Sequence, residues 1–148
     1  MATLKPEQLS AQIQSGKVGS VYLFDGPENW LKEKSIQQII AKFFQAEVRD
    51  LNIDRFNGND CSGGDVVSAA QSFPFLSIKR LVLVQAADQI SASDSKIIGD
   101  SLSNIPDTTI LIFLYEGKAG MRSEIPAQVS SSGAIITFWT PFPNQLPN

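Results

Sequence analysis

Residues 72–84 read S-F-P-F-L-S-I-K-R-L-V-L-V, and in this stretch the chain changes from a helical pattern to a buried strand. Its end, residues 81–84 (L-V-L-V), is an unbroken apolar run that is typical of a strand buried on both faces. Its first half places two phenylalanines and a leucine around Pro74, which forces the chain out of a helix. At least one of these large apolar side chains is therefore expected on a connection, and connections lie mostly on the surface and often carry function.

The composition is that of a globular protein. Of the 148 residues, 43% are hydrophobic and 18% are charged, which suits one domain with its own core. The net charge of −3 disfavours nucleic-acid binding by this chain alone, since phosphate contacts need clustered Lys and Arg. The N-terminal residues lack the apolar core of a signal peptide, and no apolar run is long enough to span a bilayer. We therefore expect a cytoplasmic protein with no membrane partner.

Strand and helix signals alternate along the chain. Five strands are predicted, at residues 20–25, 51–56, 81–84, 108–115 and 135–139, with the second at a sheet edge. Helices are predicted at residues 6–15, 28–45, 62–70, 93–102 and 122–131, with Ser62 and Ser93 as N-caps. This order predicts an α/β domain with a mostly parallel five-stranded sheet and helices on both faces. The domain is expected to span residues 1–140, and residues 141–148 read as the start of a linker.

The loop after the first strand has part of the pattern of a phosphate-binding loop. Gly26 and Lys32 have the right spacing for its first glycine and its lysine. Leu31 and Glu33 stand where a second glycine and a Ser/Thr are needed, and Pro27 removes an N–H donor. We predict a degenerate loop with a solvated Lys32, and therefore no nucleotide cofactor and no bound metal.

No catalytic constellation is recognisable. Histidine is absent, so no imidazole can activate a serine or Cys61, and the neighbouring Asp60 should raise the pKa of that thiol. A phosphate-accepting receiver domain is excluded because Asp25 stands alone and the third strand ends in Gln85. Paired carboxylates such as Asp50 and Asp54 read as solvated surface. We predict no catalytic residue.

Several short segments together carry a family resemblance. They are residues 21–28 (V-Y-L-F-D-G-P-E), 53–58 (I-D-R-F-N-G), 69–76 (A-A-Q-S-F-P-F-L) and 79–84 (K-R-L-V-L-V), followed by Leu146 and Pro147. In this order and spacing the chain resembles the N-terminal domain of the delta subunit of bacterial DNA polymerase III, a clamp-loader family, over most of residues 18–147. The resemblance implies a RecA-like AAA+ core that has lost its nucleotide site. It also implies that residues 141–148 lead toward a lid domain.

The resemblance implies a function in DNA replication, namely binding and opening of the sliding clamp (the beta subunit) without ATP hydrolysis by this chain. An apolar pair before the third strand serves as the clamp-binding wedge in that family, and by position it falls on Phe75 and Leu76. Phe73 is then expected in the core, and Lys79 and Arg80 as solvated residues at the strand entry or as the rim of the site.

Other partners follow from the same resemblance. The other clamp-loader subunits are implied partners, and DNA only within the assembled complex. The chain is then a non-catalytic subunit of a DNA-directed DNA polymerase holoenzyme. Two alternatives remain open at this point: an active P-loop AAA+ ATPase module, and a bare scaffold domain.

Overall fold

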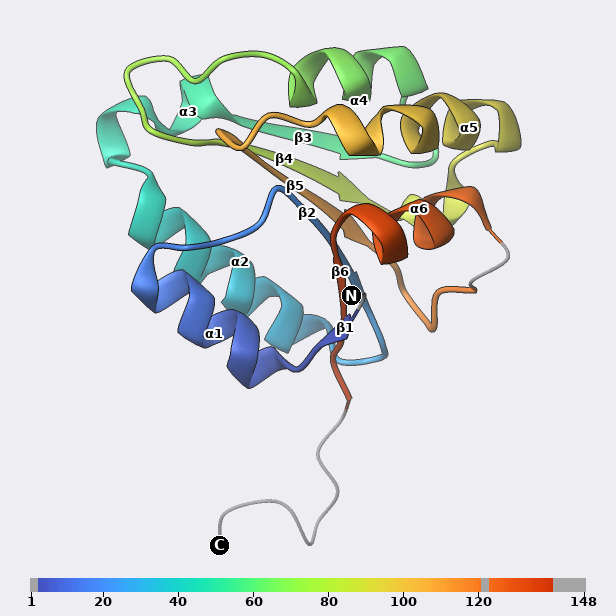
Figure 1. Ribbon diagram of the computed structural model, residues 1–148, viewed down its shortest axis with the longest axis horizontal. Coiled ribbons are helices and arrows are strands. Elements are labelled where there is room, and N and C mark those ends of the chain that lie inside the picture. The colour runs from blue at the N-terminus through green and yellow to red at the C-terminus, as the bar shows by residue number, and fades with distance from the viewer. Residues whose placement is uncertain (1–2, 121–122, 140–148) are drawn as a thin grey trace, which may run out of the picture.

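The computed structural model describes residues 3–120 and 123–139, and its centre is one parallel sheet (Figure 1). The strand order is β1-β6-β2-β5-β4-β3, and every neighbouring pair is parallel. The strands are β1 Thr3–Leu4, β2 Val21–Asp25, β3 Ile53–Asn57, β4 Arg80–Gln85, β5 Thr109–Leu114 and β6 Ala134–Thr137. The α/β class, the parallel sheet and the edge position of β3 confirm the predictions. The residues 141–148 that were read as a linker lie outside the described residues.

The described sheet has six strands, so the predicted number of five is wrong by one. The additional strand is β1, whose Thr3 and Leu4 lie beside Ile135 and Ile136 of β6. A two-residue strand is too short to produce an alternating pattern, so only its tertiary pairing defines it.

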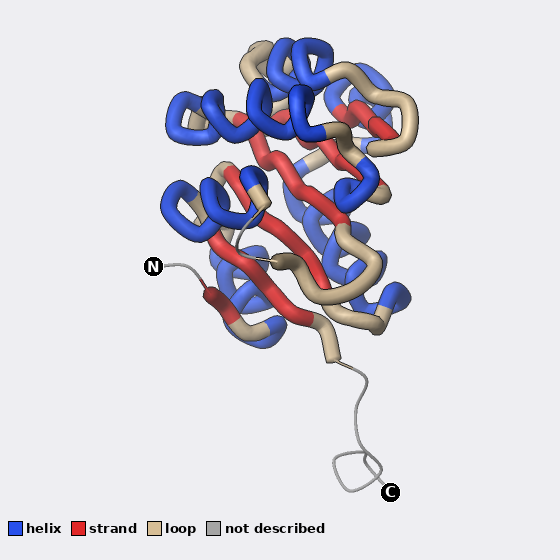
Figure 2. The backbone as a smooth tube through the Cα atoms, turned by 90° about the vertical axis from the view of Figure 1, so that its right-hand side faces the viewer, coloured by secondary structure: helices blue, strands red, loops and turns tan. Residues whose placement is uncertain are grey.

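Helices cover both faces of the sheet, as Figures 1 and 2 show. The helices are α1 Pro6–Ser15, α2 Asn29–Phe43, α3 Arg49–Asn52, α4 Gly63–Ala70, α5 Ala92–Ser101 and α6 Glu124–Ser132, with short 3₁₀ turns η1 Ala46–Val48, η2 Ala87–Gln89 and η3 Leu102–Asn104. Alternation along β2 divides the core: Tyr22 and Phe24 pack with α1 and α2, whereas Val21 and Leu23 pack with α4, α5 and α6. The sheet is therefore buried on both faces, which agrees with its near-continuous apolar strands.

Serine caps begin two of these helices. The N–H of Asp65 donates to Ser62 Oγ at 3.3 Å, as predicted for α4. The predicted cap Ser93 is wrong, because Ser91 caps α5 and accepts from the N–H of Asp94 at 3.2 Å. Ser91 has the extended backbone that a cap requires and stands three residues before that donor, so the helix begins earlier than its apolar pattern suggests. Within the described residues, no helix combines the length and the apolarity needed to cross a bilayer.

Candidate functional site: an exposed apolar loop

The connection between α4 and β4, residues 72–79, is called the apolar loop below. Four of its large apolar side chains are mostly in contact with solvent: Phe73 is 81% exposed, Phe75 55%, Leu76 76% and Ile78 71%. The prediction that Phe75 and Leu76 face outward is confirmed, and their role as a clamp-binding wedge stays a prediction. Scattered apolar residues are normal on a surface, but four within six positions of one loop form a patch of the kind that marks an interaction site.

The prediction that Phe73 lies in the core is wrong. Helix α4 ends at Ala70, and the N–H of Ser72 donates to Ala69 O at 3.3 Å while its hydroxyl donates to Ser68 O at 2.8 Å. These bonds mark the end of the helix. The helical spacing that would return Phe73 to the core face of α4 therefore no longer applies.

Polar groups fix the backbone of the apolar loop. Asn52, at the end of α3, is fully buried and bonds to both backbone groups of Phe75 at 2.7 Å. Within the loop, the hydroxyl of Ser77 donates to Lys79 O at 2.9 Å. Leu76 has a φ of +55°, a left-handed conformation that costs a non-glycine residue roughly 1–2 kcal/mol. The loop thus has a defined conformation although its large side chains contribute little to the core.

Two further predictions about the base of the loop are wrong. Arg80 is not solvated: its guanidinium pairs with the carboxylate of Asp54 on the neighbouring strand β3 and makes a long hydrogen bond of 3.4 Å to Phe73 O. Asp54 is correspondingly not a free surface carboxylate. Lys79 reaches across to Asp107 O at 2.6 Å. Asp54 lies 26 residues from Arg80 and Asp107 lies 28 residues from Lys79, so no local pattern could identify these two partners.

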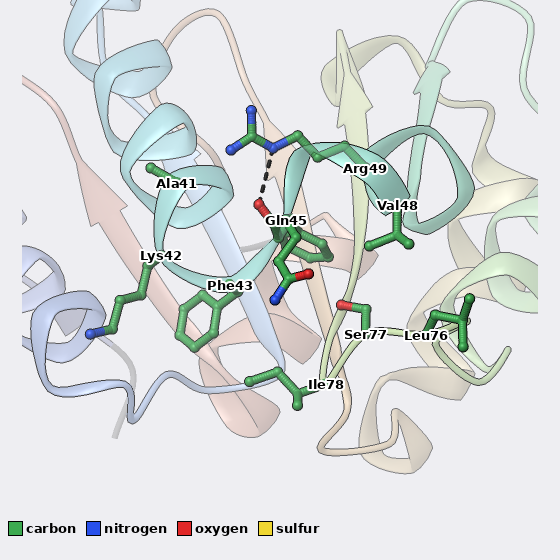
Figure 3. A pocket seen from close by; sticks show the side chains of 10 residues that line it. Ala41, Lys42, Phe43, Gln45, Val48, Arg49, Leu76, Ser77 and Ile78 are labelled. Carbon is green, nitrogen blue, oxygen red and sulfur yellow. Dashed lines mark hydrogen bonds between the residues drawn. The ribbon is translucent and has the colours of Figure 1, made fainter.

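A groove of about 680 Å³ lies beside the apolar loop (Figure 3). Phe43 from α2, Val48 from η1 and Ile78 from the loop form its apolar lining. Lys42 and Arg49 are its charged lining residues, and Arg49 Nε donates to Phe44 O at 3.0 Å. The wedge residue Leu76 also lines the groove, so the exposed loop and the groove form one continuous surface.

The degenerate phosphate loop follows β2 at the carboxyl ends of the strands, whereas the apolar loop precedes β4 at their amino ends. Lys32 is only 4% exposed, so the prediction of a solvated lysine is wrong. Its ammonium group donates to Tyr115 O at 2.6 Å and to Asn29 Oδ1 at 3.1 Å. Burial lowers the pKa of Lys32, and the nearby carboxylates of Glu116, Asp25 and Asp88 oppose this effect. Tyr115 is 83 residues away, and the hydrogen bond depends on β5 lying beside β2.

Gly26 has a packing role that explains its presence. Its φ is +94°, and a Cβ atom at this position would lie 2.5 Å from Phe138 O. The N–H of Gly26 donates to Gly117 O at 3.0 Å. Beside it, Asp25 is buried and accepts from the N–H of Ala119 at 2.8 Å and from the hydroxyl of Thr137 at 2.5 Å. The N–H of Gly26 and the carboxylate of Asp25 are therefore hydrogen-bonded within the protein itself.

A cavity of about 270 Å³ remains beside Lys32, lined among others by Asn57, Gln85 and Tyr115. Burial, with a smaller contribution from Asp88, raises the pKa of Tyr115 to about 12.

The pKa of Cys61 is raised, as predicted. Burial is the main cause, and the carboxylates of Asp94 and Asp60 add to it. In the part of the chain that the structure describes, no group of three or more His, Cys, Asp or Glu side chains is placed to hold a metal ion.

Solved structures with this arrangement define its class. The Bacillus subtilis DNA clamp loader delta protein matches 90% of this chain and 42% of its own length, with a TM-score of 0.81 and 17% identity. A DNA polymerase III gamma subunit-related protein from Thermotoga maritima matches 92% of this chain and 46% of its own, with a TM-score of 0.64 and 12% identity. The RuvB Holliday junction branch migration motor from Thermotoga maritima matches 94% and 45%, with a TM-score of 0.55 and 16% identity. The fold is that of an AAA+ core.

Sequence comparison narrows this class. The family model described as DNA polymerase III, delta subunit, matches residues 22–137. The DNA polymerase III subunit delta of Bacillus subtilis is 27% identical over 73 residues, which are 49% of this chain and 21% of that protein. The chain belongs to the DNA polymerase III delta-subunit family. It spans less than half the length of these two Bacillus subtilis relatives.

Proposed function

We propose that this chain is the clamp-binding domain of a clamp-loader delta subunit in DNA replication. The wedge, Phe75 and Leu76, enters an apolar pocket of the sliding clamp. The observation that carries the proposal is the exposure of large apolar side chains on a loop whose backbone is held by buried hydrogen bonds. Membership of the delta-subunit family supports the choice of the clamp as the partner.

The binding energy of the wedge requires further contacts. Burial of two large apolar side chains supplies roughly 3–6 kcal/mol before the cost of association, whereas a micromolar complex needs about 8 kcal/mol. Phe73 and Ile78 on the same loop add apolar area. The groove beside the loop, with its charged rim of Lys42 and Arg49, supplies contacts to the surroundings of the pocket.

The proposed mechanism uses binding energy rather than hydrolysis. The wedge binds the open form of the clamp interface better than the closed form, so association shifts the clamp toward the open form. ATP acts in other loader subunits, which are this chain's further partners, and DNA is contacted only within the assembled complex. The hydrogen bonds that occupy the Lys32 ammonium support the absence of hydrolysis here.

The main test is the variant Phe75→Ala combined with Leu76→Ala. Its clamp affinity should fall at least about a hundredfold, because burial of the two side chains is expected to supply roughly 3–6 kcal/mol. Its melting temperature should change little, because both side chains are exposed. Calorimetric titration with the clamp and a thermal melt measure the two effects.

The matched control is Ile97→Ala, which removes an exposed apolar side chain from α5. It should leave clamp affinity unchanged. A wedge variant that binds the clamp like the wild type refutes the proposed function. Equilibrium dialysis with Mg·ATP tests the ATPase alternative: micromolar binding, lost in Lys32→Ala, is the result that favours it.

A further inference from the structure

Asn52 makes an unusual set of contacts for a single side chain. Its Nδ2 donates to Val48 O at 2.9 Å and to Phe75 O at 2.7 Å, and its Oδ1 accepts from the N–H of Phe75 at 2.7 Å. Both N–H donors of the amide are therefore used, together with its oxygen. The side chain is fully buried, although it lies under a loop whose apolar side chains are exposed.

These contacts determine the orientation of the amide. If its nitrogen and oxygen were exchanged, the amide NH₂ would face the N–H of Phe75 and the oxygen would face two carbonyl groups. The bond to Val48, four residues earlier, holds the side chain against its own helix α3. The remaining two bonds grip Phe75 as a neighbouring strand would, by its N–H and its C=O together.

The grip acts directly on the wedge. Phe75 is the first wedge residue, and the next residue, Leu76, has the left-handed φ of +55°. A non-glycine residue keeps such a conformation only where its surroundings impose it. Asn52 holds the backbone immediately before Leu76, while the hydroxyl of Ser77 holds the backbone after it.

We infer that Asn52 is a positioning residue that presets the wedge for clamp binding without contacting the clamp. This inference rests on the proposed function. A loop that is ordered before binding loses less conformational entropy on association, so affinity depends on a residue outside the interface. Asparagine suits this role: aspartate lacks both donors, alanine lacks all three bonds, and glutamine displaces the amide by one methylene group.

The first experiment measures clamp affinity by calorimetric titration, at a temperature where every variant is folded. Asn52→Ala and Asn52→Asp should each lower the affinity by about tenfold or more. The matched control is Ser101→Ala, because Ser101 is also buried and donates to a backbone carbonyl, Ile98 O at 2.7 Å, but this bond lies within α5 and involves no residue of the loop. This variant should lose stability but keep its affinity for the clamp.

The second experiment does not need the clamp, and its first comparison uses the wild-type protein alone. Amide hydrogen exchange of the wild-type protein should show protection at Phe75 that is about tenfold or more above that at Leu76. Within the described residues, the N–H of Phe75 bonds to Asn52, whereas no partner is found for the N–H of Leu76. In Asn52→Ala, which removes the acceptor of this N–H, the protection at Phe75 should fall.

The outcomes separate the two ideas. Equal exchange at Phe75 and Leu76 in the wild type overturns the role of Asn52, whatever the variants do. Full clamp affinity in both Asn52 variants, alongside loss of affinity in the wedge variant, also overturns the role of Asn52 and leaves the proposed function intact. Full affinity in the wedge variant overturns the proposed function and the role of Asn52 with it.

Discussion

The amino and carboxyl ends of the strands differ in which kind of side chain they bury. At the apolar loop, which precedes β4, large apolar side chains are exposed while polar groups such as Asn52 are buried beneath them. At the carboxyl ends of the strands, the charged Lys32 and Asp25 are buried and hydrogen-bonded to the protein itself. Among the described residues, two non-glycine residues have a left-handed φ: Leu76 at +55°, before β4, and Ala86 at +50°, directly after it.

Under the proposed function, binding takes place at the apolar loop and not at the carboxyl ends of the strands. In open α/β sheets, ligands usually bind at the carboxyl ends of the strands. Here the ammonium of Lys32 bonds within the protein, and Gly26 is packed against Phe138 O. The exposed large apolar side chains lie instead on the apolar loop, at the amino end of β4. We therefore expect substitutions at the carboxyl ends of the strands to change the stability of the fold without changing clamp affinity. Substitutions in the apolar loop should change clamp affinity and leave stability nearly unchanged.

The largest expected change in stability comes from Lys32→Ala. The substitution leaves the buried Tyr115 carbonyl without its donor and creates a cavity, so the free energy of unfolding should fall by roughly 2–3 kcal/mol. Clamp affinity should not change. Urea unfolding and calorimetric titration measure the two effects. Lys34→Ala on the same helix removes an exposed lysine and should cost less than about 1 kcal/mol. Equal losses in both variants contradict the structural role of Lys32.

A smaller effect is expected from the burial of Tyr115. Its folded-state pKa of about 12 lies above the ordinary value of 10, so the folded state keeps the phenol neutral while the unfolded chain ionises. The resulting stabilisation is complete below pH 10 and is lost as the pH rises toward 12. In Tyr115→Phe this loss should be smaller by roughly 1–2 kcal/mol, since residual hydration weakens the penalty.

Urea unfolding of the wild type and Tyr115→Phe at pH 9 and pH 11.5 tests this expectation. The stability of the wild type should decrease more steeply with pH than that of the variant. Burial also raises the pKa of Tyr22, so some alkaline loss should persist in the variant. Identical pH dependence in the two proteins contradicts the expectation, because it indicates that the Tyr115 phenol is hydrated in the folded state.

The smallest effect on stability, and the sharpest test of the contrast, comes from a pair of glycine substitutions. Leu76→Gly and Ala86→Gly both relieve a left-handed φ, but glycine also adds entropy to the unfolded chain. Each variant should therefore be unchanged or more stable by at most about 1 kcal/mol. Only Leu76→Gly should lose clamp affinity, because only Leu76 belongs to the wedge. Loss of clamp affinity in Ala86→Gly contradicts the proposal that the clamp binds at the apolar loop alone.

Sequence patterns predicted the elements well where local physics decides them. The apolar runs of β4 and β5 and the cap Ser62 are local signals, and the break at Pro74 predicted that at least one large apolar side chain lies on a connection. The outward position of Phe75 and Leu76 came from the family resemblance. The polar contacts beside the apolar loop escaped prediction. Asn52 lies 23 residues before Phe75, and Asp54 lies 26 residues before Arg80. Neither pair leaves a periodic signal, since each depends on α3 and β3 lying beside the loop and β4.

What the amino-acid sequence determined by itself is the parallel α/β fold and the exit of the chain from α4 around Pro74, because hydrophobic periodicity and proline act over a few residues. What only the tertiary structure decided is which polar groups are buried and which large apolar side chains are exposed. Lys32 is buried because its partner Tyr115 is supplied by β5, and Phe73 is exposed because α4 ends before its spacing can return it to the core. Partners for buried polar groups come from neighbours in space, and neighbouring strands of a parallel sheet are far apart along the chain.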